Sequence, residues 1–464
     1  MENFFHIRER GSNVKTEVLA GITTFMTMAY ILMVNPGIFS DLGDGYYNAV
    51  YIATALSAVI GTVLIGLLAN LPLAQAPGMG LNAFFVYTVC FGMGFTYANA
   101  LVFVLIDGVI FLLLTVTGLR RMIFEAIPKT IRIAIPAGIG LFIAFLGFQD
   151  AGIVQPNEST GVSLASFNLL GGQAWGDIMP MVITVIGIFL IAILTKRGVK
   201  GAIFWGILGC TVLYYVCGIL VPGFYDGFGA NFSFAPFAAF SDFTKLSFGK
   251  VFTEGFDFSI YLASHSTADL VITFISTSLA FCMVDMFDTL GTLYGACARG
   301  NLLDETGDVP NMEKAMLSDA IATTCGSICG TSTVTTFVES SAGVAEGGRT
   351  GLSALVTAGL FFVSLFLTPI ASLIPSAATA AALIYVGILM MNGVKEIEWT
   401  DPAVAVPAFL AIAMMPFTYN ISYGIAFGVL SYIVIHAFTG KLREVNVGTW
   451  IIGVLFVAMF LLTH

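Results

Sequence analysis

The sequence predicts an all-α polytopic membrane protein. Of its 464 residues, 58% are hydrophobic and 10% are charged, whereas a soluble domain carries about a quarter of charged residues. Apolar runs long enough to cross a bilayer recur along nearly the whole chain. These runs lack the alternation of membrane β-strands, and an open structure would leave backbone polar groups unsatisfied in lipid. We therefore expect a helical bundle that takes up almost the entire chain.

Fourteen apolar segments follow one another, and we expect each to cross the membrane. The first seven lie near 18–37, 49–69, 74–91, 98–118, 130–148, 178–195 and 201–221. The second seven lie near 270–296, 313–330, 331–346, 351–371, 376–392, 402–417 and 420–438. The predicted parts are a cytoplasmic N-terminus (1–17), a first seven-span repeat (18–221), an extracellular connection (222–269), a second seven-span repeat (270–438) and a C-terminal tail (439–464).

The positive charges indicate the orientation. With the N-terminus inside, alternation of the spans places all of the 18 Lys and Arg except Lys245 and Lys250 in cytoplasmic segments. These two belong to the long connection, where the positive-inside rule has little weight. No hydrophobic signal-peptide core precedes the first span. The last apolar run, 450–462, is short for a span and fits either an interfacial helix or a tilted extra segment.

The two sets of seven segments resemble inverted repeats. The motif Glu125-Ala-Ile-Pro128 precedes one span in the first set, and Ser372-Leu-Ile-Pro375 precedes its counterpart in the second. Because seven is an odd number, the second set enters the membrane from the opposite side. Inverted repeats of this kind place a binding site near the membrane midplane and commonly build it from interrupted helices.

Two spans are predicted to be half strand and half helix. The third span contains Pro77, Gly78 and Gly80, which a continuous lipid-facing helix disfavours. The tenth span begins with the β-branched run 331–336, which favours an extended backbone. Both segments are therefore candidates for the walls of a binding site.

Acids well inside the predicted spans are the first candidate site residues. We select Asp285, Asp288, Asp319 and Glu339. Placing a charged side chain at the centre of a span costs about 2.5–3.5 kcal/mol. An acid at such a position is therefore a candidate for ligand binding or proton transfer. Asp285 and Asp288 are three residues apart and face the same side of a helix. A hydrogen bond to a neighbouring helix is the alternative for each aspartate, and for Asp319 it is the favoured one.

Glu339 and Asn82 lie in the two interrupted spans. We expect Glu339 at the start of a half-helix, where free N–H groups and the helix dipole favour a negative charge. Its alternative is an ordinary first-turn acid. Asn82 both donates and accepts hydrogen bonds, as recognition of a planar heterocycle requires; closing a local turn is its alternative. Candidate stacking partners for a flat ligand are Phe25, Phe84, Phe281 and Phe337.

Other classes of function are disfavoured. The seven cysteines lie in or at the ends of apolar runs, without the spacing of a disulfide framework or a metal site, and we expect no cofactor. No basic stripe indicates nucleic acid, and no phosphate-binding loop indicates ATP. An integral-membrane enzyme that acts through Asp285 and Asp288 is a weaker alternative, because such enzymes place their acids at the membrane surface. A channel is weaker still.

Four motifs carry a resemblance to a known family. GITTFMTMAYILMVNP (21–36), APGMGLNAFF (76–85), VDMFDTLGTLYG (284–295) and GTSTVTTFVESSAGVAEGGRTGL (330–352) resemble the AzgA-like branch of the second nucleobase:cation symporter family, the hypoxanthine, guanine and adenine permeases. The likeness runs from about residue 4 to residue 445. Two departures are the absence of a histidine shortly after Asp288, which the uracil branch has, and an expanded outer segment at 256–270.

The resemblance implies a fold and a site. The fold is a fourteen-span, seven-plus-seven inverted repeat like that of the related uracil permease. In it, a core domain of spans one to four and eight to eleven moves against a gate domain of the other spans. The resemblance also implies that Asp288 rather than Asp285 is the eighth-span substrate acid, that Glu339 is the tenth-span acid, and that Asn82 is the asparagine of the third span.

The predicted function is purine import by proton symport, with elevator-like alternating access. Glu339 accepts hydrogen bonds from the base, and Asp288 binds its other edge or carries the proton. Asp285 and Glu339 are further candidates for proton coupling. Additional hydrogen bonds to the base are expected from Thr335, Thr336 and Ser340.

The expected partners are a purine base, a proton and the lipid bilayer of the cell membrane. A homodimer is compatible with the sequence. Alternatives on the same fold are carriers of xanthine, of a pyrimidine such as uracil, or of an anion. An anion site would favour a basic residue near the midplane, and the predicted spans contain none there.

Overall fold

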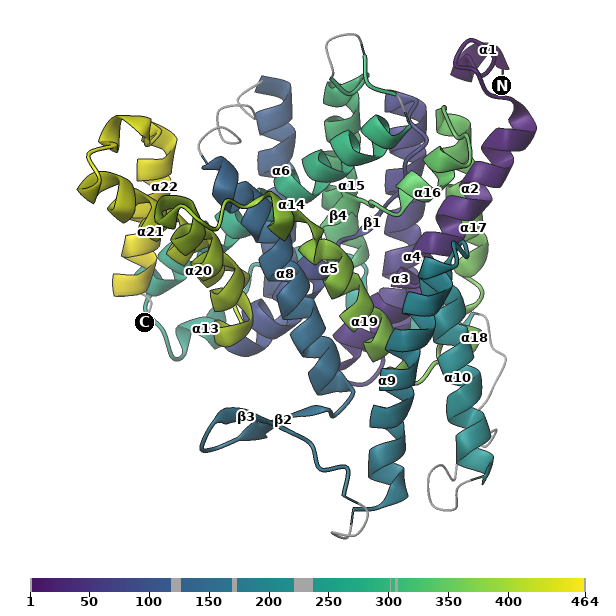
Figure 1. Cartoon of the computed structure of the whole chain (residues 1–464), viewed down its shortest axis with the longest axis horizontal. Coiled ribbons are helices and arrows are strands. Elements are labelled where there is room, and N and C mark those ends of the chain that lie inside the picture. Colours follow the sequence, from purple (N-terminus) through teal and green to yellow (C-terminus); the bar gives the residue numbers. More distant parts are fainter. Residues whose placement is uncertain are drawn as a thin grey trace.

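The computed structural model describes residues 2–117, 127–168, 173–220, 237–300, 302–304 and 308–462 (Figure 1). Within these residues, nine helical stretches are long and apolar enough to cross a membrane. They are Val14–Ser40, Tyr46–Ala69, Tyr97–Thr117, Lys129–Asp150, Trp175–Lys196, Ala202–Leu220, Thr267–Cys297, Ser376–Glu396 and Ile421–Phe438. Shorter apolar helices are Met79–Gly92, Gly351–Ser364, Pro402–Thr418 and Val447–Leu461. The protein is thus a mostly helical, polytopic membrane protein, as predicted.

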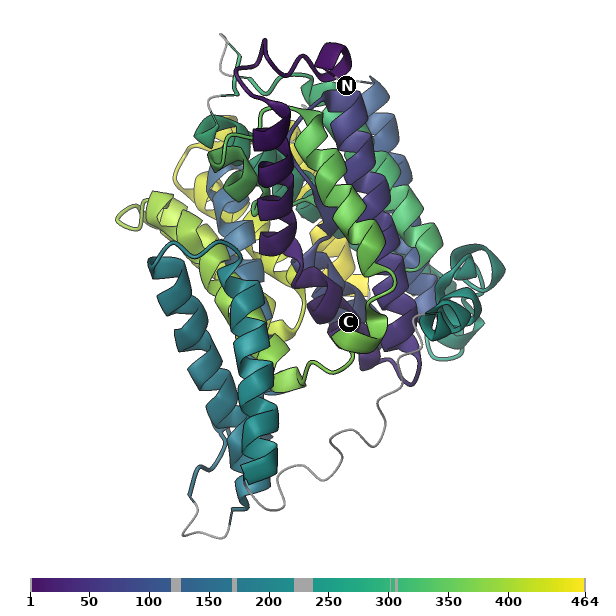
Figure 2. The ribbon, with the colours of Figure 1, turned by 90° about the vertical axis from the view of Figure 1, so that its right-hand side faces the viewer.

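The helices form two packing groups. The first helix group consists of α2 (Val14–Met28), α3 (Ile31–Ser40), α4 (Tyr46–Leu64) with η1 (Ile65–Ala69), α6 (Tyr97–Thr117), α14 (Thr267–Arg299), α15 (Met312–Cys329), α16 (Ser340–Ala345) and α17 (Gly351–Ser364). The second helix group consists of α8 (Lys129–Asp150), α9 (Trp175–Lys196), α10 (Ala202–Leu220), α19 (Ser376–Met390), α20 (Pro402–Thr418) and α21 (Ile421–Phe438). Figure 2 shows α9 and α10 side by side at the edge of the molecule.

Two strands occupy the centre of the first helix group. Strand β1 (Gln75–Pro77) pairs antiparallel with β4 (Val334–Thr336), and all six residues are buried. The ladder continues beyond the strands, since Phe337 N donates to Ala74 O at 3.0 Å. These strands confirm the predicted extended stretches of the two interrupted segments. Backbone that is not helical is tolerated at this depth because protein surrounds it.

A short helix follows each strand. Strand β1 leads into α5 (Met79–Ala83) and η2 (Phe84–Gly92), and β4 leads into α16. Gly330 separates α15 from β4 with a φ of +95°, a conformation that favours glycine. A Cβ atom there would lie 2.5 Å from Ser247 Cβ and 2.6 Å from the Tyr97 hydroxyl. Glycine therefore permits the sharp turn that brings β4 back beside β1.

The peripheral elements are short. They are α1 (Glu2–Phe5), the hairpin β2 (Val154–Asn157) and β3 (Gly161–Leu164), α11 (Ala238–Asp242), η4 (Phe243–Ser247), α12 (Lys250–Thr253), α13 (Ser259–Leu262), α18 (Thr368–Ala371), η5 (Met391–Glu396), η6 (Leu442–Glu444) and α22 (Val447–Leu462). The final apolar run is thus a 16-residue helix, and it packs against α14 and α21. Glu125 and Ala126 of the first repeat motif and residues 221–236 of the predicted connection lie outside the described residues.

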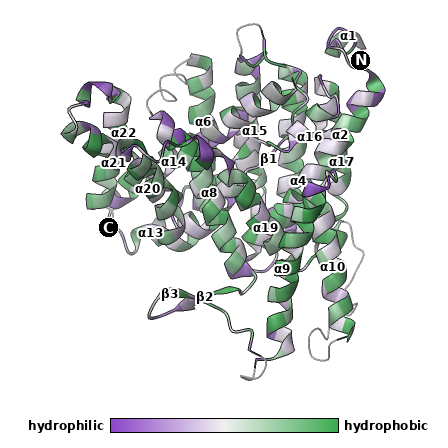
Figure 3. Ribbon diagram, in the orientation of Figure 1, coloured by the Kyte–Doolittle hydropathy of each residue, from purple (hydrophilic) through white to green (hydrophobic). Residues whose placement is uncertain are grey.

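Hydrophobic side chains cover the outer surface of the second helix group. Figure 3 shows α9 and α10 as largely hydrophobic along their length. Phe189, Ile193, Val212 and Ile219 are each more than half exposed. Apolar side chains that point outward along whole helices are favourable in lipid and unfavourable in water. This surface agrees with a protein that the bilayer surrounds.

Candidate functional site

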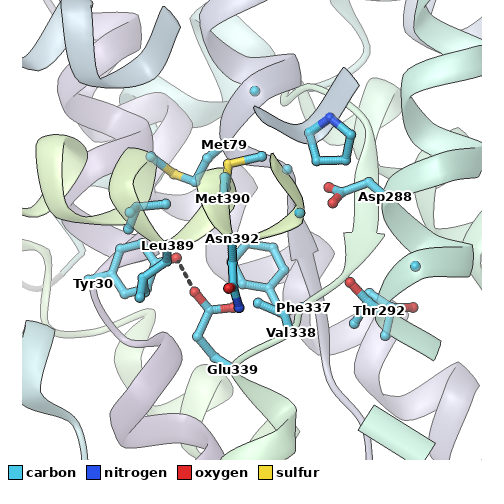
Figure 4. Close-up of a pocket in the computed structure, with 17 residues that line it drawn as sticks. Tyr30, Met79, Asp288, Thr292, Phe337, Val338, Glu339, Leu389, Met390 and Asn392 are labelled. Atoms are coloured by element: carbon cyan, nitrogen blue, oxygen red, sulfur yellow. Dashed lines mark hydrogen bonds between the residues drawn. The ribbon is translucent and has the colours of Figure 1, made fainter. Parts of the chain in front are cut away.

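A pocket lies between the two helix groups, and we refer to it as the interface pocket (Figure 4). Its volume is about 340 Å³, within the range typical of small-molecule sites. The first helix group and its strands contribute Tyr30, Gly78, Met79, Gly80, Asp288, Gly291, Thr292, Thr336, Phe337, Val338 and Glu339. The second helix group and η5 contribute Pro136, Val386, Leu389, Met390, Asn392 and Gly393.

Glu339 reaches the interface pocket from the start of a half-helix, as predicted. It occupies the N-cap position of α16, where its side chain caps no backbone N–H group. The hydroxyl of Tyr30 donates to Glu339 Oε1 at 2.6 Å. Tyr30 lies at the break between α2 and α3. One carboxylate oxygen is therefore held by tyrosine, while the group keeps acceptor capacity for a ligand.

Asp288 lines the interface pocket from α14. Its Oδ2 atom accepts a hydrogen bond of 3.3 Å from Thr335 Oγ1. Gly291 lies one helical turn further along and also lines the pocket. A Cβ atom added at Gly291 would meet nothing within 4 Å. In Figure 4, Asp288 and Glu339 lie on different sides of the pocket, so a ligand placed between them would meet a carboxylate at each side.

The three hydroxyl side chains that we expected to bind the base lie in different places relative to the interface pocket. Thr336 lines the interface pocket, and its Oγ1 atom accepts from Gln75 Nε2 at 3.2 Å. Thr335 lies behind Asp288 and holds that carboxylate. Ser340 is buried outside the pocket lining, where its Oγ atom accepts from Ala74 N at 3.0 Å. Thr335 and Ser340 therefore position other groups of the site.

Asn82 also lies outside the pocket lining. Its Oδ1 atom accepts a hydrogen bond from Ser332 Oγ, and its Nδ2 atom is 3.5 Å from Pro77 O. The asparagine is fully buried. It fastens the turn between β1 and α5 to the segment that precedes β4. This position corresponds to the alternative that we considered from the sequence, the closing of a local turn.

Asp285 is buried away from the interface pocket. Its two carboxyl oxygens have no hydrogen-bond partner among the described residues. Asp319, another predicted candidate, accepts hydrogen bonds from Thr289 and Gln75. Asp107 on α6 belongs to the same buried region and is absent from the predicted candidates. The sequence signal was present, because Asp107 is the one acid in an apolar helix of 21 residues.

Several residues of the interface pocket were not predicted. Tyr30, Thr292 and Asn392 bring polar groups, and Met79 and Met390 bring apolar surface. Tyr30 belongs to a motif that carries the family resemblance, which is a signal that could have identified it. Asn392 follows α19 and comes from the opposite helix group. Its place in the pocket depends on how the two groups pack, and sequence pattern does not reveal that packing.

Of the four phenylalanines considered as stacking partners, Phe337 lines the interface pocket. Phe84 and Phe281 pack against each other, with ring centroids 4.8 Å apart. Phe25 packs against Phe361 at 5.2 Å. These three rings fill space between helices, which is the common role of phenylalanine in a helical bundle.

A pocket with a few polar groups lies between two helix groups and is reached by half-helices inside a membrane protein, which is the arrangement of a secondary transporter. The sequence pattern of the Permease family matches residues 15–427. The chain therefore belongs to the Permease family, and it is a membrane transporter. This result confirms the resemblance described above and removes the membrane-enzyme alternative.

Individual relatives cover the chain from end to end. The guanine/hypoxanthine permease PbuO of Bacillus subtilis is 38% identical over 463 residues, which is 99% of this chain and 100% of the relative. The adenine permease AdeP of Escherichia coli is 37% identical over 457 residues, 98% of this chain and 95% of the relative. Among solved structures, the transmembrane domain of the cyanobacterial bicarbonate transporter BicA has a TM-score of 0.61 at 15% identity and covers 89% of this chain and 97% of that chain. This last likeness shows a shared fold.

Proposed function

We propose that the protein imports purine nucleobases, namely guanine, hypoxanthine or adenine, across the cell membrane together with protons. The observation that carries this proposal is the presence of two carboxyl groups, Asp288 and Glu339, on different sides of one pocket between the two helix groups. The names of the relatives PbuO and AdeP support the choice of purines.

The chemistry of the interface pocket suits a purine. Ring N–H groups and exocyclic amino groups are donors, and carboxylates are the strongest acceptors among side chains. Apolar walls are contributed by Phe337, Met79 and Met390, and they suit the faces of a flat aromatic ring. The carboxylates would bind the edges of the base, and the apolar side chains would cover its faces.

The two helix groups support a transport cycle by relative movement. We assign the first group as the core domain and the second as the gate domain, within fourteen spans arranged as a seven-plus-seven inverted repeat. Pro128 precedes α8 and Pro375 precedes α19, and these two helices pack against each other. The antiparallel pair β1–β4 relates the two repeats in the same way. The N-terminus would be cytoplasmic, and the base would cross as the core domain slides along the gate domain.

Intramembrane acids would carry the coupled proton. The candidates from the sequence are Asp285, Asp288 and Glu339. Within a membrane span, the protonated form of an acid costs less free energy than its charged form. Because no histidine follows shortly after Asp288, we assign this step to carboxyl groups.

The proposal is tested by uptake of labelled hypoxanthine, guanine, adenine, xanthine and uracil in cells that lack their own carriers. We expect saturable uptake of the purines hypoxanthine, guanine or adenine, and loss of accumulation on addition of a protonophore. Uptake of xanthine or uracil in preference to these three would refute the substrate assignment. Uptake that the protonophore leaves unchanged would refute proton coupling.

Tyr30→Phe is expected to weaken purine uptake without abolishing it. The change removes the 2.6 Å hydrogen bond to Glu339. A hydrogen bond to a charged group contributes about 1.5–3 kcal/mol, which corresponds to about a 10- to 100-fold effect. We expect this loss in the KM for hypoxanthine, because the carboxylate is still present but less well oriented. An unchanged KM would show that Tyr30 does not orient Glu339 for binding.

Gly291→Leu is expected to reduce purine uptake at least about tenfold by filling the interface pocket. Nothing lies within 4 Å of a Cβ at this position, so the side chain can enter the pocket without a clash in the helix. The matched control is Gly359→Leu in α17, which also has nothing within 4 Å but does not line the pocket. Equal uptake by the two variants would contradict the assignment of the pocket.

A further inference from the structure

Three carboxyl groups are buried together outside the interface pocket. Asp107 lies on α6, Asp285 on α14 and Asp319 on α15, and each is 0% exposed. They are close enough for their charges to interact. Helices α6 and α15 touch at this level, since a Cβ at Gly108 would lie 2.5 Å from Thr324 Oγ1. We refer to these three residues as the buried acid cluster.

The buried acid cluster has too few donors for its oxygen atoms. Thr333 Oγ1 donates to Asp107 Oδ2 at 3.2 Å, and Thr289 Oγ1 donates to Asp319 Oδ1 at 3.0 Å. Among the residues that the structure describes, no hydrogen-bond partner reaches the four other oxygens, which are Asp107 Oδ1, Asp285 Oδ1, Asp285 Oδ2 and Asp319 Oδ2. A buried oxygen without a donor is costly. Bound protons would supply the donors that these oxygens lack.

Thr323 does not supply the missing proton. It lies beside Asp285, but its hydroxyl donates to Val334 O at 3.1 Å and accepts from Val334 N at 3.2 Å. The amide of Gln75, also fully buried, donates to Asp319 Oδ1 at 3.1 Å, and its own oxygen has no partner. The described neighbours therefore leave Asp285 unsatisfied.

In the helices that carry the buried acid cluster and in the strands beside it, basic residues are confined to helix ends. The sequences of α4, α6, β1 and β4 contain no Lys, Arg or His. In α15 the one basic residue is Lys314, which is exposed near the start of the helix, and in α14 it is the terminal Arg299. The other titratable neighbours are Cys282 and Asp288, which add no positive charge. Three uncompensated charges would cost several kcal/mol each.

Bound protons would resolve both problems. A protonated carboxyl group is neutral and carries an O–H donor, and nearby carboxylates favour its protonation, as in pairs of acids that share one proton. Each proton removes one negative charge and satisfies one acceptor. The three carboxyl groups together can therefore take up and release protons at a place that is separate from the interface pocket.

Hydrogen bonds connect the buried acid cluster to the interface pocket through β4. Thr336 lines the pocket, and its Oγ1 atom accepts from the same Gln75 amide nitrogen that donates to Asp319. Thr336 N donates to Thr289 Oγ1 at 3.3 Å, and Thr289 in turn donates to Asp319. Asp285 is also one helical turn from Asp288. A ligand that moves Thr336 or Asp288 would thus change the surroundings of the cluster.

We infer that Asp107, Asp285 and Asp319 form the proton-binding site of this transporter, while Asp288 and Glu339 bind the base. The inference rests on the proposed purine–proton symport. It assigns proton binding to one set of acids and base binding to the other. Proton release from the cluster to the cytoplasm would follow departure of the base from the interface pocket.

The test uses the full-length protein in proteoliposomes, with labelled hypoxanthine as the substrate. A gradient of about one pH unit drives up to about tenfold accumulation when one proton accompanies each base. Exchange of internal for external hypoxanthine, or counterflow, needs no net proton movement. We expect Asp107→Asn, Asp285→Asn and Asp319→Asn to equilibrate hypoxanthine without accumulation, while counterflow stays within about twofold of wild type. Asp285→Glu should restore accumulation, and Asp177→Asn, an exposed acid on α9, should behave as wild type.

Three results would overturn the inference. The first is wild-type accumulation by all three asparagine variants. The second is loss of counterflow together with accumulation in all three, since this would place the acids in base binding or in folding. The third is wild-type accumulation that follows a sodium gradient in place of the pH gradient. A wild-type protein that carries no purine in either assay would instead refute the proposed function, so the two failures are distinguishable.

Discussion

Glu339→Gln is expected to abolish purine uptake, with a loss of at least about 100-fold. The glutamine side chain has nearly the same volume, so the interface pocket keeps its shape. In the proposed binding mode, however, one carboxylate oxygen becomes an NH₂ group that faces the N–H donors of the base. Two charge-assisted hydrogen bonds at about 1.5–3 kcal/mol each are weakened or lost. Initial uptake rates of labelled hypoxanthine, normalised to the amount of protein in the membrane, measure the effect.

The matched control for this variant is Glu346→Gln at the other end of α16. Glu346 forms an ion pair with Lys200 and does not line the interface pocket. A partly exposed ion pair contributes about 0–1 kcal/mol, so uptake should stay close to wild type. Near-normal uptake by Glu339→Gln would refute the role of this carboxylate in binding the base.

Asp288→Asn is expected to cause a loss of similar size, at least about 100-fold. Asparagine can still accept a hydrogen bond from Thr335, so the local packing should survive. The variant loses the negative charge that, in the proposed binding mode, faces the second edge of the base. If the buried acid cluster carries the proton, the residual transport of this variant should still respond to a pH gradient. The measurement is hypoxanthine uptake together with binding to the purified protein.

Asp269→Asn is the control on the same helix. Asp269 lies in the first turn of α14, where it accepts from Ser266 N at 2.9 Å. Replacing this carboxylate weakens a helix cap that contributes about 1 kcal/mol to stability, and it leaves the interface pocket intact. Full hypoxanthine affinity in Asp288→Asn, measured beside this control, would contradict the proposed contact with the base.

The helical segments could be predicted from the sequence because hydrophobicity and length determine them. The interrupted segments were also predictable, since Pro77, Gly78 and a β-branched run disfavour continuous helix in lipid. The pairing of β1 with β4 could not be read from either segment alone. It depends on two stretches of chain, separated by more than 250 residues, that satisfy each other's backbone groups.

The candidate site was predictable where an isolated charge marked it. Glu339 and Asp288 stand out as acids within apolar runs, and both line the interface pocket. An isolated acid in an apolar run also marks Asp107, which is not among the candidates predicted from the sequence. Asn82 fitted the pattern of a binding residue, yet it bonds to Ser332 and Pro77. A side chain's polarity indicates that it needs partners, but only the packing decides whether those partners are protein or ligand.

The ladder between β1 and β4 has a consequence for how the base is held. It joins the two half-helices, so Thr336 and Glu339 would keep their distance from Met79 during the sliding movement that we propose. The recognition surface on this side would then be identical whether the pocket opens to the exterior or to the cytoplasm. The opposing side would change, and it is formed by Pro136, Val386, Leu389, Met390, Asn392 and Gly393. Half-saturation by hypoxanthine should therefore be similar in right-side-out and inverted vesicles, and accumulation would depend on the gradient alone.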